Sequence, residues 1–158
     1  YLPLLCGGTV ELVNSDDLQD GIVLKEKVEN SNATLIQATP STWRMLLSAG
    51  WESKVSKPKL LCGGQALSHD LASELLLRSS LLWNMYGPTE TTIWSSIYLV
   101  KPEHKIFLGR PIANTSFSIQ LAVDFSLHSG GFPGFKPKQI DIELSVGQSH
   151  QVEYCLIL

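Results

Sequence analysis

The chain has 158 residues, of which 44% are hydrophobic and 17% are charged, and its formal net charge is −3. This length suits one domain with a buried core, and the negative balance gives no electrostatic basis for binding nucleic acid or an anionic membrane. The sequence contains no run of about 18 apolar residues, so we expect no transmembrane helix.

Isolated cysteines and histidines argue against a metal centre or a disulfide framework. Cys6, Cys62 and Cys155 are far apart and match no zinc-ligand spacing, which predicts reduced thiols and a cytoplasmic protein. The four histidines are isolated, and we expect each of them at the surface. The first residues, YLPLLCGG, lack an initiating Met and a basic region, which predicts an origin in the middle of a longer protein.

Turn residues and apolar spacing predict elements along the whole chain. In the first half they are the end of a helix at residues 1–5 stopped by Gly7 and Gly8, a strand at 9–13, a helix at 21–29, a strand at 34–38, and a helix at 42–49 capped by Ser41 and ended by Gly50. In the second half they are a strand at 59–62, a leucine-rich helix at 70–78 capped by Ser68, strands at 81–85 and 91–100, and β character at 116–121.

This alternation of strands and short helices predicts an α/β fold with a mostly parallel sheet flanked by helices. Three polar turns, at residues 37–39, 63–65 and 84–90, directly follow predicted strands. Parallel strands bring such turns to one edge, where open α/β sheets bind ligands. The convergence favours a binding site there, although loops of parallel sheets also converge in the absence of function.

The polar turn after the fourth predicted strand is the most informative segment. Residues 81–93 read LLWNMYGPTETTI, an apolar run followed by adjacent Gly87 and Pro88. The turn presents an aromatic ring, a hydroxyl and a carboxylate, which suit a base, a phosphate oxygen and Mg²⁺ respectively. A short piece of this pattern would indicate only a surface turn with a solvated Glu, whereas the unbroken NxYGPTE string favours a nucleoside triphosphate site.

Four motifs resemble the adenylate-forming enzymes. NMYGPTETTIW is similar to their signature loop, in the form with Asn84 and Pro88 that is typical of amino-acid adenylation domains of nonribosomal peptide synthetases. QATPSTWRMLLSAGW from Gln37, LLCGGQAL from Leu60 and LGRPIANT from Leu108 resemble the same family in the expected order. The resemblance implies that residues 1–120 are a partial adenylation domain, within the large N-terminal subdomain of such an enzyme.

The resemblance also implies roles for individual residues. Tyr86 would stack on adenine, Asn84 would hydrogen-bond the adenine edge, Thr89 would contact the α-phosphate and Glu90 would bind Mg²⁺. The alternatives are a strand-end tyrosine and a turn-forming asparagine without a ligand. Thr89 and Glu90 are the implied catalytic residues, and the implied nucleotide-binding set is Gly63, Gly64, Gln65, Asn84, Tyr86, Gly87 and Thr89.

The implied reaction joins an amino acid to ATP. The amino-acid carboxylate attacks the α-phosphate, which gives an aminoacyl-adenylate and pyrophosphate for loading onto the phosphopantetheine thiol of a carrier domain. Carrier and condensation domains of the parent synthetase are the implied partners. The implied side-chain pocket, in which the Trp94 indole fills space and favours glycine, consists of Gln37, Leu61, Gly63, Met85, Ile93 and Trp94. The alternative places Trp94 on the other face as ordinary core.

The resemblance ends near Gln120. Residues 121–158 lack the family's GELxIGG stretch and include HSGGFPGFKPK, so they are predicted to be a divergent tail that arose by a reading-frame change or by real divergence. We expect this tail to pack poorly.

The chain also lacks several motifs that the family uses in catalysis. The sequence contains no Lys-ended phosphate loop, no YRTGD-like motif and no C-terminal subdomain with its catalytic Lys, so the isolated chain is expected to be inactive. Two other interpretations stay open: a fragment of an acyl-CoA synthetase or other acid–thiol ligase, and a non-catalytic truncated remnant. The flanking coding sequence would distinguish them.

Overall fold

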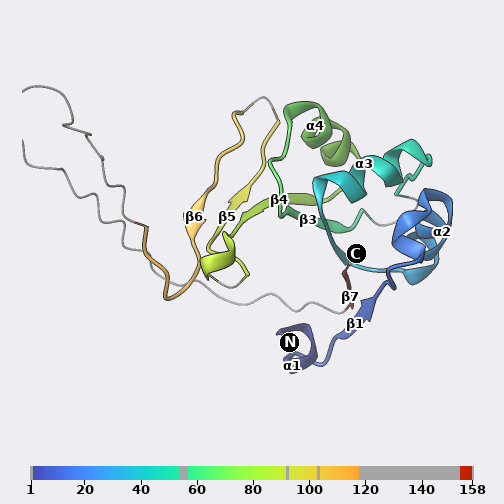
Figure 1. The fold of residues 1–158 in the computed structure, drawn as a ribbon, viewed down its shortest axis with the longest axis horizontal. Helices are drawn as coiled ribbons and strands as arrows, with labels where there is room; N and C mark the ends of the chain where they lie inside the picture. The colour runs from blue at the N-terminus through green and yellow to red at the C-terminus, as the bar shows by residue number, and fades with distance from the viewer. Residues whose placement is uncertain (1, 54–56, 92, 103, 118–153, 158) are drawn as a thin grey trace, which may run out of the picture.

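The computed structural model describes residues 2–53, 57–91, 93–102, 104–117 and 154–157. Within these ranges the strands form one sheet in the order β1-β7-β2-β3-β4-β5-β6 (Figure 1). In chain order the elements are α1 (Leu2–Leu5), β1 (Thr9–Leu12), η1 (Asp17–Gln19), α2 (Gly21–Ser31), β2 (Leu35–Ala38), α3 (Pro40–Ser48), β3 (Lys59–Gly63), α4 (His69–Arg78), β4 (Leu81–Tyr86), η2 (Thr89–Thr91), β5 (Ser96–Leu99), β6 (Arg110–Pro111) and β7 (Tyr154–Ile157).

The predicted mostly parallel sheet is confirmed. β2, β3 and β4 are parallel neighbours, and α3 and α4 form the crossovers between them. β7 is parallel to both β1 and β2, whereas β5 and β6 continue the sheet in antiparallel fashion beyond β4. The chain therefore has an α/β core around the three strands that precede the polar turns.

Helix capping explains where the central helices begin. The Ser68 side chain accepts from the Leu71 amide and caps α4, as predicted. The prediction that Ser41 caps the preceding helix, α3, is wrong. This helix starts at Pro40, and the Thr39 side chain caps it by accepting from the Thr42 amide. Proline at the first helical position lacks an N–H that would need a partner, so it favours this earlier start.

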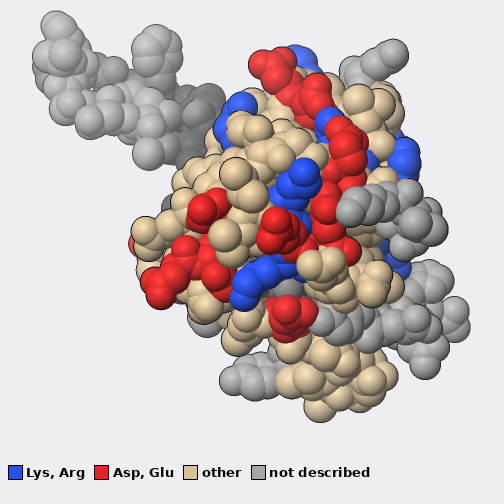
Figure 2. Space-filling view, turned by 90° about the vertical axis from the view of Figure 1, so that its right-hand side faces the viewer, with Lys and Arg blue, Asp and Glu red and all other residues tan. Residues whose placement is uncertain are grey.

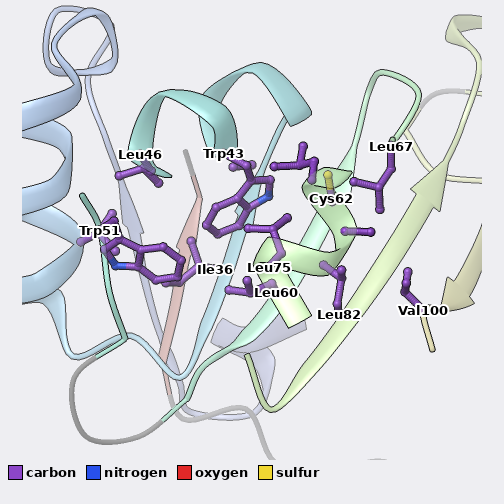
Figure 3. Close-up of a cluster of buried hydrophobic side chains, with 14 of the residues drawn as sticks. Ile36, Trp43, Leu46, Trp51, Leu60, Cys62, Leu67, Leu75, Leu82 and Val100 are labelled. Atoms are coloured by element: carbon purple, nitrogen blue, oxygen red, sulfur yellow. The ribbon is translucent and has the colours of Figure 1, made fainter. Parts of the chain in front are cut away.

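The core lies between the sheet and helices α2, α3 and α4 (Figure 3). Alternate residues of the central strands point into it, including Ile36, Leu60, Cys62 and Leu82. Helices supply the opposing side chains Leu24, Val28, Trp43, Leu46, Leu71, Ala72 and Leu75. The Trp43 and Trp51 rings lie 5.6 Å apart between centroids, so large aromatic side chains fill the layer beside β2 and β3.

Two predictions about strands need correction. The strand expected at 91–100 is shorter, since β5 begins at Ser96 and Thr91 belongs to η2. The chain needs these residues to reverse direction before it can pair antiparallel with β4. Ser116 and Phe117 are not in a strand, and the rest of the segment expected at 116–121 lies outside the described residues.

The C-terminal strand also departs from expectation. β7 pairs with β1 and β2 inside the sheet, which differs from the expected poor packing for residues 154–157. Residues 121–153 lie outside the described part of the chain. The origin of the tail, by reading-frame change or divergence, stays a prediction.

Charged side chains of both signs intermingle on the face shown in Figure 2. Arg78 forms a mixed-charge cluster of its own: its guanidinium donates to the Trp51 carbonyl and pairs with Glu52 and Glu74. These bonds tie the end of α4 to the segment after α3. No helix among the described residues is long and apolar enough to cross a membrane.

We predict that Leu60→Ala lowers the free energy of unfolding by about 2–5 kcal/mol, because it leaves a cavity around a fully buried strand position. Leu77→Ala is the matched control, since Leu77 is 68% exposed and its truncation should change stability by no more than about 0.5 kcal/mol. Urea unfolding followed by circular dichroism measures both. Equal effects of the two substitutions would contradict the described core.

Candidate functional site

The three predicted turns converge at one edge of the sheet. Cys62 lies opposite Ala38 on β2 and opposite Asn84 on β4, so the parallel strands end close together. The turns after them follow at this same edge: a β-carbon added at Gly64 would lie 3.7 Å from the Thr39 methyl group. The predicted convergence is confirmed.

Residues predicted to line the amino-acid pocket share one face of the sheet. Register places Gln37 beside Leu61, and Gly63 beside Met85. Side chains alternate along a strand, so these residues point away from the face that carries Ile36, Leu60 and Leu82. Helices α2, α3 and α4 pack on the face that carries Ile36, Leu60 and Leu82. On the opposite face Gln37, Leu61 and Met85 are half-buried.

Trp94 joins this set through a close contact with Gly63. A β-carbon built on Gly63 would lie 2.5 Å from Trp94 Cη2 and 2.9 Å from the Met85 carbonyl oxygen. No residue with a side chain fits there without displacing the indole. The alternative in which Trp94 packs in the core on the opposite face is therefore wrong, since its ring lies against Gly63 and is half-buried.

Ile93 is the least enclosed member of the predicted pocket, with 63% of its surface exposed. Its backbone is nonetheless closely packed, because a β-carbon at Gly87 would overlap the Ile93 carbonyl. The structure thus brings together Gln37, Leu61, Gly63, Met85 and Trp94 at the edge, and places the Ile93 side chain at the surface.

Thr89 and Glu90 lie in the short helical turn η2, and both side chains are exposed. Thr91, which follows them, folds this turn: its amide and its hydroxyl both donate to the Pro88 carbonyl, at 3.1 Å and 3.0 Å. Ser95 returns the chain to β4 by donating its amide to the Tyr86 carbonyl at 2.7 Å. A hydroxyl and a carboxylate therefore project from a turn that is fixed at both ends.

Asn84 and Tyr86 occupy the other face of β4, and their environments differ. Tyr86 ends the strand and is 38% exposed, so its ring is accessible at the edge. Asn84 is buried, and its amide nitrogen donates to the Phe107 carbonyl at 2.9 Å. The residue predicted to contact adenine therefore already holds a backbone segment of its own chain.

That segment, Phe107 to Gly109, was not among the predicted site residues although it holds Asn84 in place. The Ser96 hydroxyl donates to the Leu108 carbonyl at 2.7 Å, and the Tyr98 and Phe107 rings meet edge to face. Gly109 has φ +88°, and a β-carbon on it would overlap the Ile97 carbonyl. The glycine in the LGRPIANT motif was the available signal for this close approach.

Two side chains of α3 also hold the loop after β3. Ser41 donates to the Gln65 side chain at 2.7 Å, and Arg44 donates to the Ser68 hydroxyl at 2.7 Å. Ser41 was predicted only as a helix cap, and no role was predicted for Arg44. These bonds set the direction in which the predicted nucleotide-binding residues Gly64 and Gln65 leave the sheet.

The ionisable groups near this edge do not form a metal-binding cluster. Among the residues that the structure describes, no three His, Cys, Asp or Glu side chains are grouped to hold a metal ion. His69 and His104 are exposed, as expected, while His128 and His150 lie outside the described residues. Burial raises the pKa of the Cys62 thiol from 9.0 to about 12, which keeps this strand residue neutral beneath the site.

Comparison with known proteins decides the family. The family model described as AMP-binding enzyme matches residues 1–122. The chain belongs to the AMP-binding enzymes.

Similar proteins include peptide synthetases. The chain is 38% identical over 115 residues to a PKS-NRPS hybrid synthetase of Aspergillus niger and 35% identical over 117 residues to a dimodular nonribosomal peptide synthase of Bacillus subtilis. These matches cover 73% of this chain but only 6% and 5% of the relatives. This AMP-binding chain is therefore a fragment of a nonribosomal peptide synthetase adenylation domain, as predicted.

Solved structures agree in fold. A four-domain nonribosomal peptide synthetase bound to AMP and glycine matches with a TM-score of 0.59 and 43% identity, over 63% of this chain and 8% of that one. A protein containing adenylation and PCP domains matches with a TM-score of 0.50 and 28% identity, over 65% of this chain and 22% of that one. The α/β architecture of this AMP-binding chain is thus that of adenylation proteins.

We predict that Cys62 of the folded chain resists alkylation by iodoacetamide at pH 8, whereas exposed Cys6 reacts. Peptide mass spectrometry reports each site, and unfolding in urea should make Cys62 react as fast as Cys6. Because the folded-state pKa is raised, the stability contributed by the neutral thiol is fully present below pH 9.0 and is lost as pH rises toward 12. Rapid labelling of Cys62 in the folded chain would contradict its burial.

Proposed function

We propose that this chain supplies part of the amino-acid and nucleotide site of an adenylation domain. In the proposed reaction the carboxylate of an amino acid attacks the α-phosphate of ATP and displaces pyrophosphate. The observation that carries the proposal is the close contact between the Trp94 ring and Gly63. The exposed turn with Thr89 and Glu90 shortly precedes Trp94 in the chain.

The chain's residues fit the nucleotide half of this site. An exposed Tyr86 ring at the end of β4 offers a stacking surface for adenine. Gly64, with φ +85° and an exposed backbone, lets a ligand approach the chain closely. Thr89 would donate its hydroxyl to a phosphate oxygen, and Gly87 would keep the turn compact.

Asn84 would also contact the nucleotide, but with only part of its side-chain amide group. One amide N–H of its side chain already donates to Phe107, so contact with the adenine edge would use the rest of the amide group. This arrangement would let Asn84 align the base with the Phe107 backbone.

Glu90 is the proposed Mg²⁺ ligand. A single exposed carboxylate fits this ion, which is commonly held by one or two carboxylates together with substrate phosphates and water. When bound, Mg²⁺ would neutralise charge on the phosphate oxygens. Glu90 would hold the cation close to the α-phosphate.

Glycine is the proposed amino acid. The indole of Trp94 covers the place beside Gly63 toward which a substrate side chain would extend, and Met85 borders the same place. A solved structure 43% identical to this chain is bound to AMP and glycine, which supports the assignment. The aminoacyl-adenylate would then load a phosphopantetheine thiol on a carrier domain of the parent synthetase, next to a condensation domain.

The proposal is testable by segment exchange. Residues 1–117 would replace the equivalent segment of the four-domain synthetase that binds AMP and glycine, and ATP–pyrophosphate exchange would be measured with different amino acids. We expect glycine to support exchange, alanine to be disfavoured by about 10–200-fold for its extra methyl group, and leucine to be nearly excluded. A preference for leucine with Trp94 intact would refute the glycine assignment.

In the exchanged enzyme, Trp94→Ala should admit alanine and larger side chains, since the indole no longer fills the space next to Gly63. Trp83→Ala is the matched control, because it removes an indole from the same sheet face farther from the edge. The ratio of kcat/KM for glycine to that for alanine should fall in the first variant and stay constant in the second. Equal ratios in both variants would mean that Trp94 does not face the substrate.

Glu90→Gln in the same enzyme should raise the Mg²⁺ concentration needed for half-maximal exchange, because an amide binds the cation less tightly than a carboxylate. Glu26→Gln on α2 changes another exposed carboxylate away from the edge and should have no effect. Titration of exchange against Mg²⁺ measures both. An unchanged Mg²⁺ dependence would remove Glu90 from the metal site.

A further inference from the structure

We propose that Thr91 and Ser95 are positioning residues that hold the Trp94 indole over Gly63 and so set how strictly the pocket selects its amino acid. This inference deepens the proposed function and rests on it. It adds a specificity device outside the residues that line the predicted pocket.

The device begins with a pair of hydroxyl groups. Thr91 Oγ1 and Ser95 Oγ share a hydrogen bond of 2.5 Å, and Thr91 Oγ1 also lies 3.0 Å from the Pro88 carbonyl. Ser95 is only 1% exposed, which shields its end of this bond from water, whereas Thr91 is exposed. One threonine side chain therefore ties the start of the loop between β4 and β5 to its end.

Backbone contacts also fix the residues on both sides of Trp94. The Ser95 amide donates to the Tyr86 carbonyl, and its own carbonyl accepts from the Ile112 amide at 3.0 Å. On the other side, the Ile93 carbonyl packs where Gly87 has no β-carbon. Trp94 thus extends from a short stretch of chain whose two neighbours are each held in place.

The fixed backbone on both sides of Trp94 sets the direction of its indole ring. Gly63 removes the steric obstacle on β3, but an absent side chain cannot pull the ring toward it. The fixed backbone at residues 93 and 95 supplies the direction, and the ring then meets the α-carbon of Gly63. If the hydroxyl pair were lost, the backbone would relax and the indole would move away from Gly63, which would enlarge the pocket without changing any residue that lines it.

The test uses the full chain and one proton as a reporter. The Gly63 α-proton that takes the place of a side chain lies beside the Trp94 ring, whose ring current should displace its NMR resonance. Trp94→Leu removes the ring and defines the resonance without it. We expect Thr91→Val and Ser95→Ala to shift the Gly63 resonance toward the Trp94→Leu position, while Thr91→Ser, which keeps the hydroxyl, retains the wild-type position.

Matched controls separate this effect from general loosening. Thr9→Val on β1 and Ser73→Ala on α4 remove exposed hydroxyls far along the sheet and on another element, and should leave the Gly63 resonance unchanged. Amide exchange at buried Leu60 confirms that each variant is folded. If Thr91→Val prevents folding, Ser95→Ala and Thr91→Ser still decide the question, because one loses the bond and the other keeps it.

Two outcomes would overturn the proposal. One is a wild-type Gly63 resonance in folded Thr91→Val and Ser95→Ala; the other is a resonance that Trp94→Leu does not move. Neither depends on catalysis, so failure here is distinguishable from failure of the segment-exchange assay. In that assay Thr91→Val should lower the glycine-to-alanine ratio of kcat/KM toward the ratio of Trp94→Ala. The separate variant Thr91→Ser should keep the wild-type ratio.

Discussion

Parallel pairing of β2, β3 and β4 is the constraint on which the rest of this structure depends. β3 is hydrogen-bonded on both sides, and its inward residues Leu60 and Cys62 are fully buried beneath α3 and α4. A shift of one residue in its register would turn these side chains outward and bring Leu61 into the core. The same shift would move Gly63 away from Met85 and separate the polar turns. Burial of the core therefore also aligns the edge at which the proposed site lies.

The two faces of the sheet carry different parts of the proposed chemistry. The helix-covered face ends in Asn84 and Tyr86, which are assigned to the nucleotide. On the opposite face Gln37, Leu61 and Gly63 reach the edge beside Trp94, where the amino acid would lie. An amino-acid carboxylate and an α-phosphate could then meet at the strand ends, close to the turn with Thr89 and Glu90. This division explains why substitutions on one face should alter amino-acid selection while leaving nucleotide contacts in place.

Glycines make the edge compact enough for this arrangement. Gly63 receives an indole, Gly87 a backbone carbonyl from residue 93, and Gly109 a carbonyl from residue 97. At each position a β-carbon would displace the partner, so the three close approaches depend on a missing side chain rather than on an attractive group. Attraction comes from the hydrogen bonds beside them, made by Ser95, Ser96 and Asn84. The proposed selectivity for glycine therefore depends on backbone packing as much as on the residues that would touch the substrate.

The sequence by itself determined the order of helices and strands from α1 to β5, the cap at Ser68, the convergence of the polar turns and the family, because these depend on local residue chemistry and on contiguous motifs. It misjudged the start of α3, where Thr39 and Ser41 compete as caps and Pro40 at the first helical position favours Thr39. Tertiary structure alone decided that Trp94 meets Gly63, that Asn84 is bonded to Phe107, and that β7 lies between β1 and β2. The partners in these contacts are at least 23 positions apart in the sequence, and those of β1 and β7 are more than 100 apart. No local propensity or spacing encodes which distant partner a buried group will find.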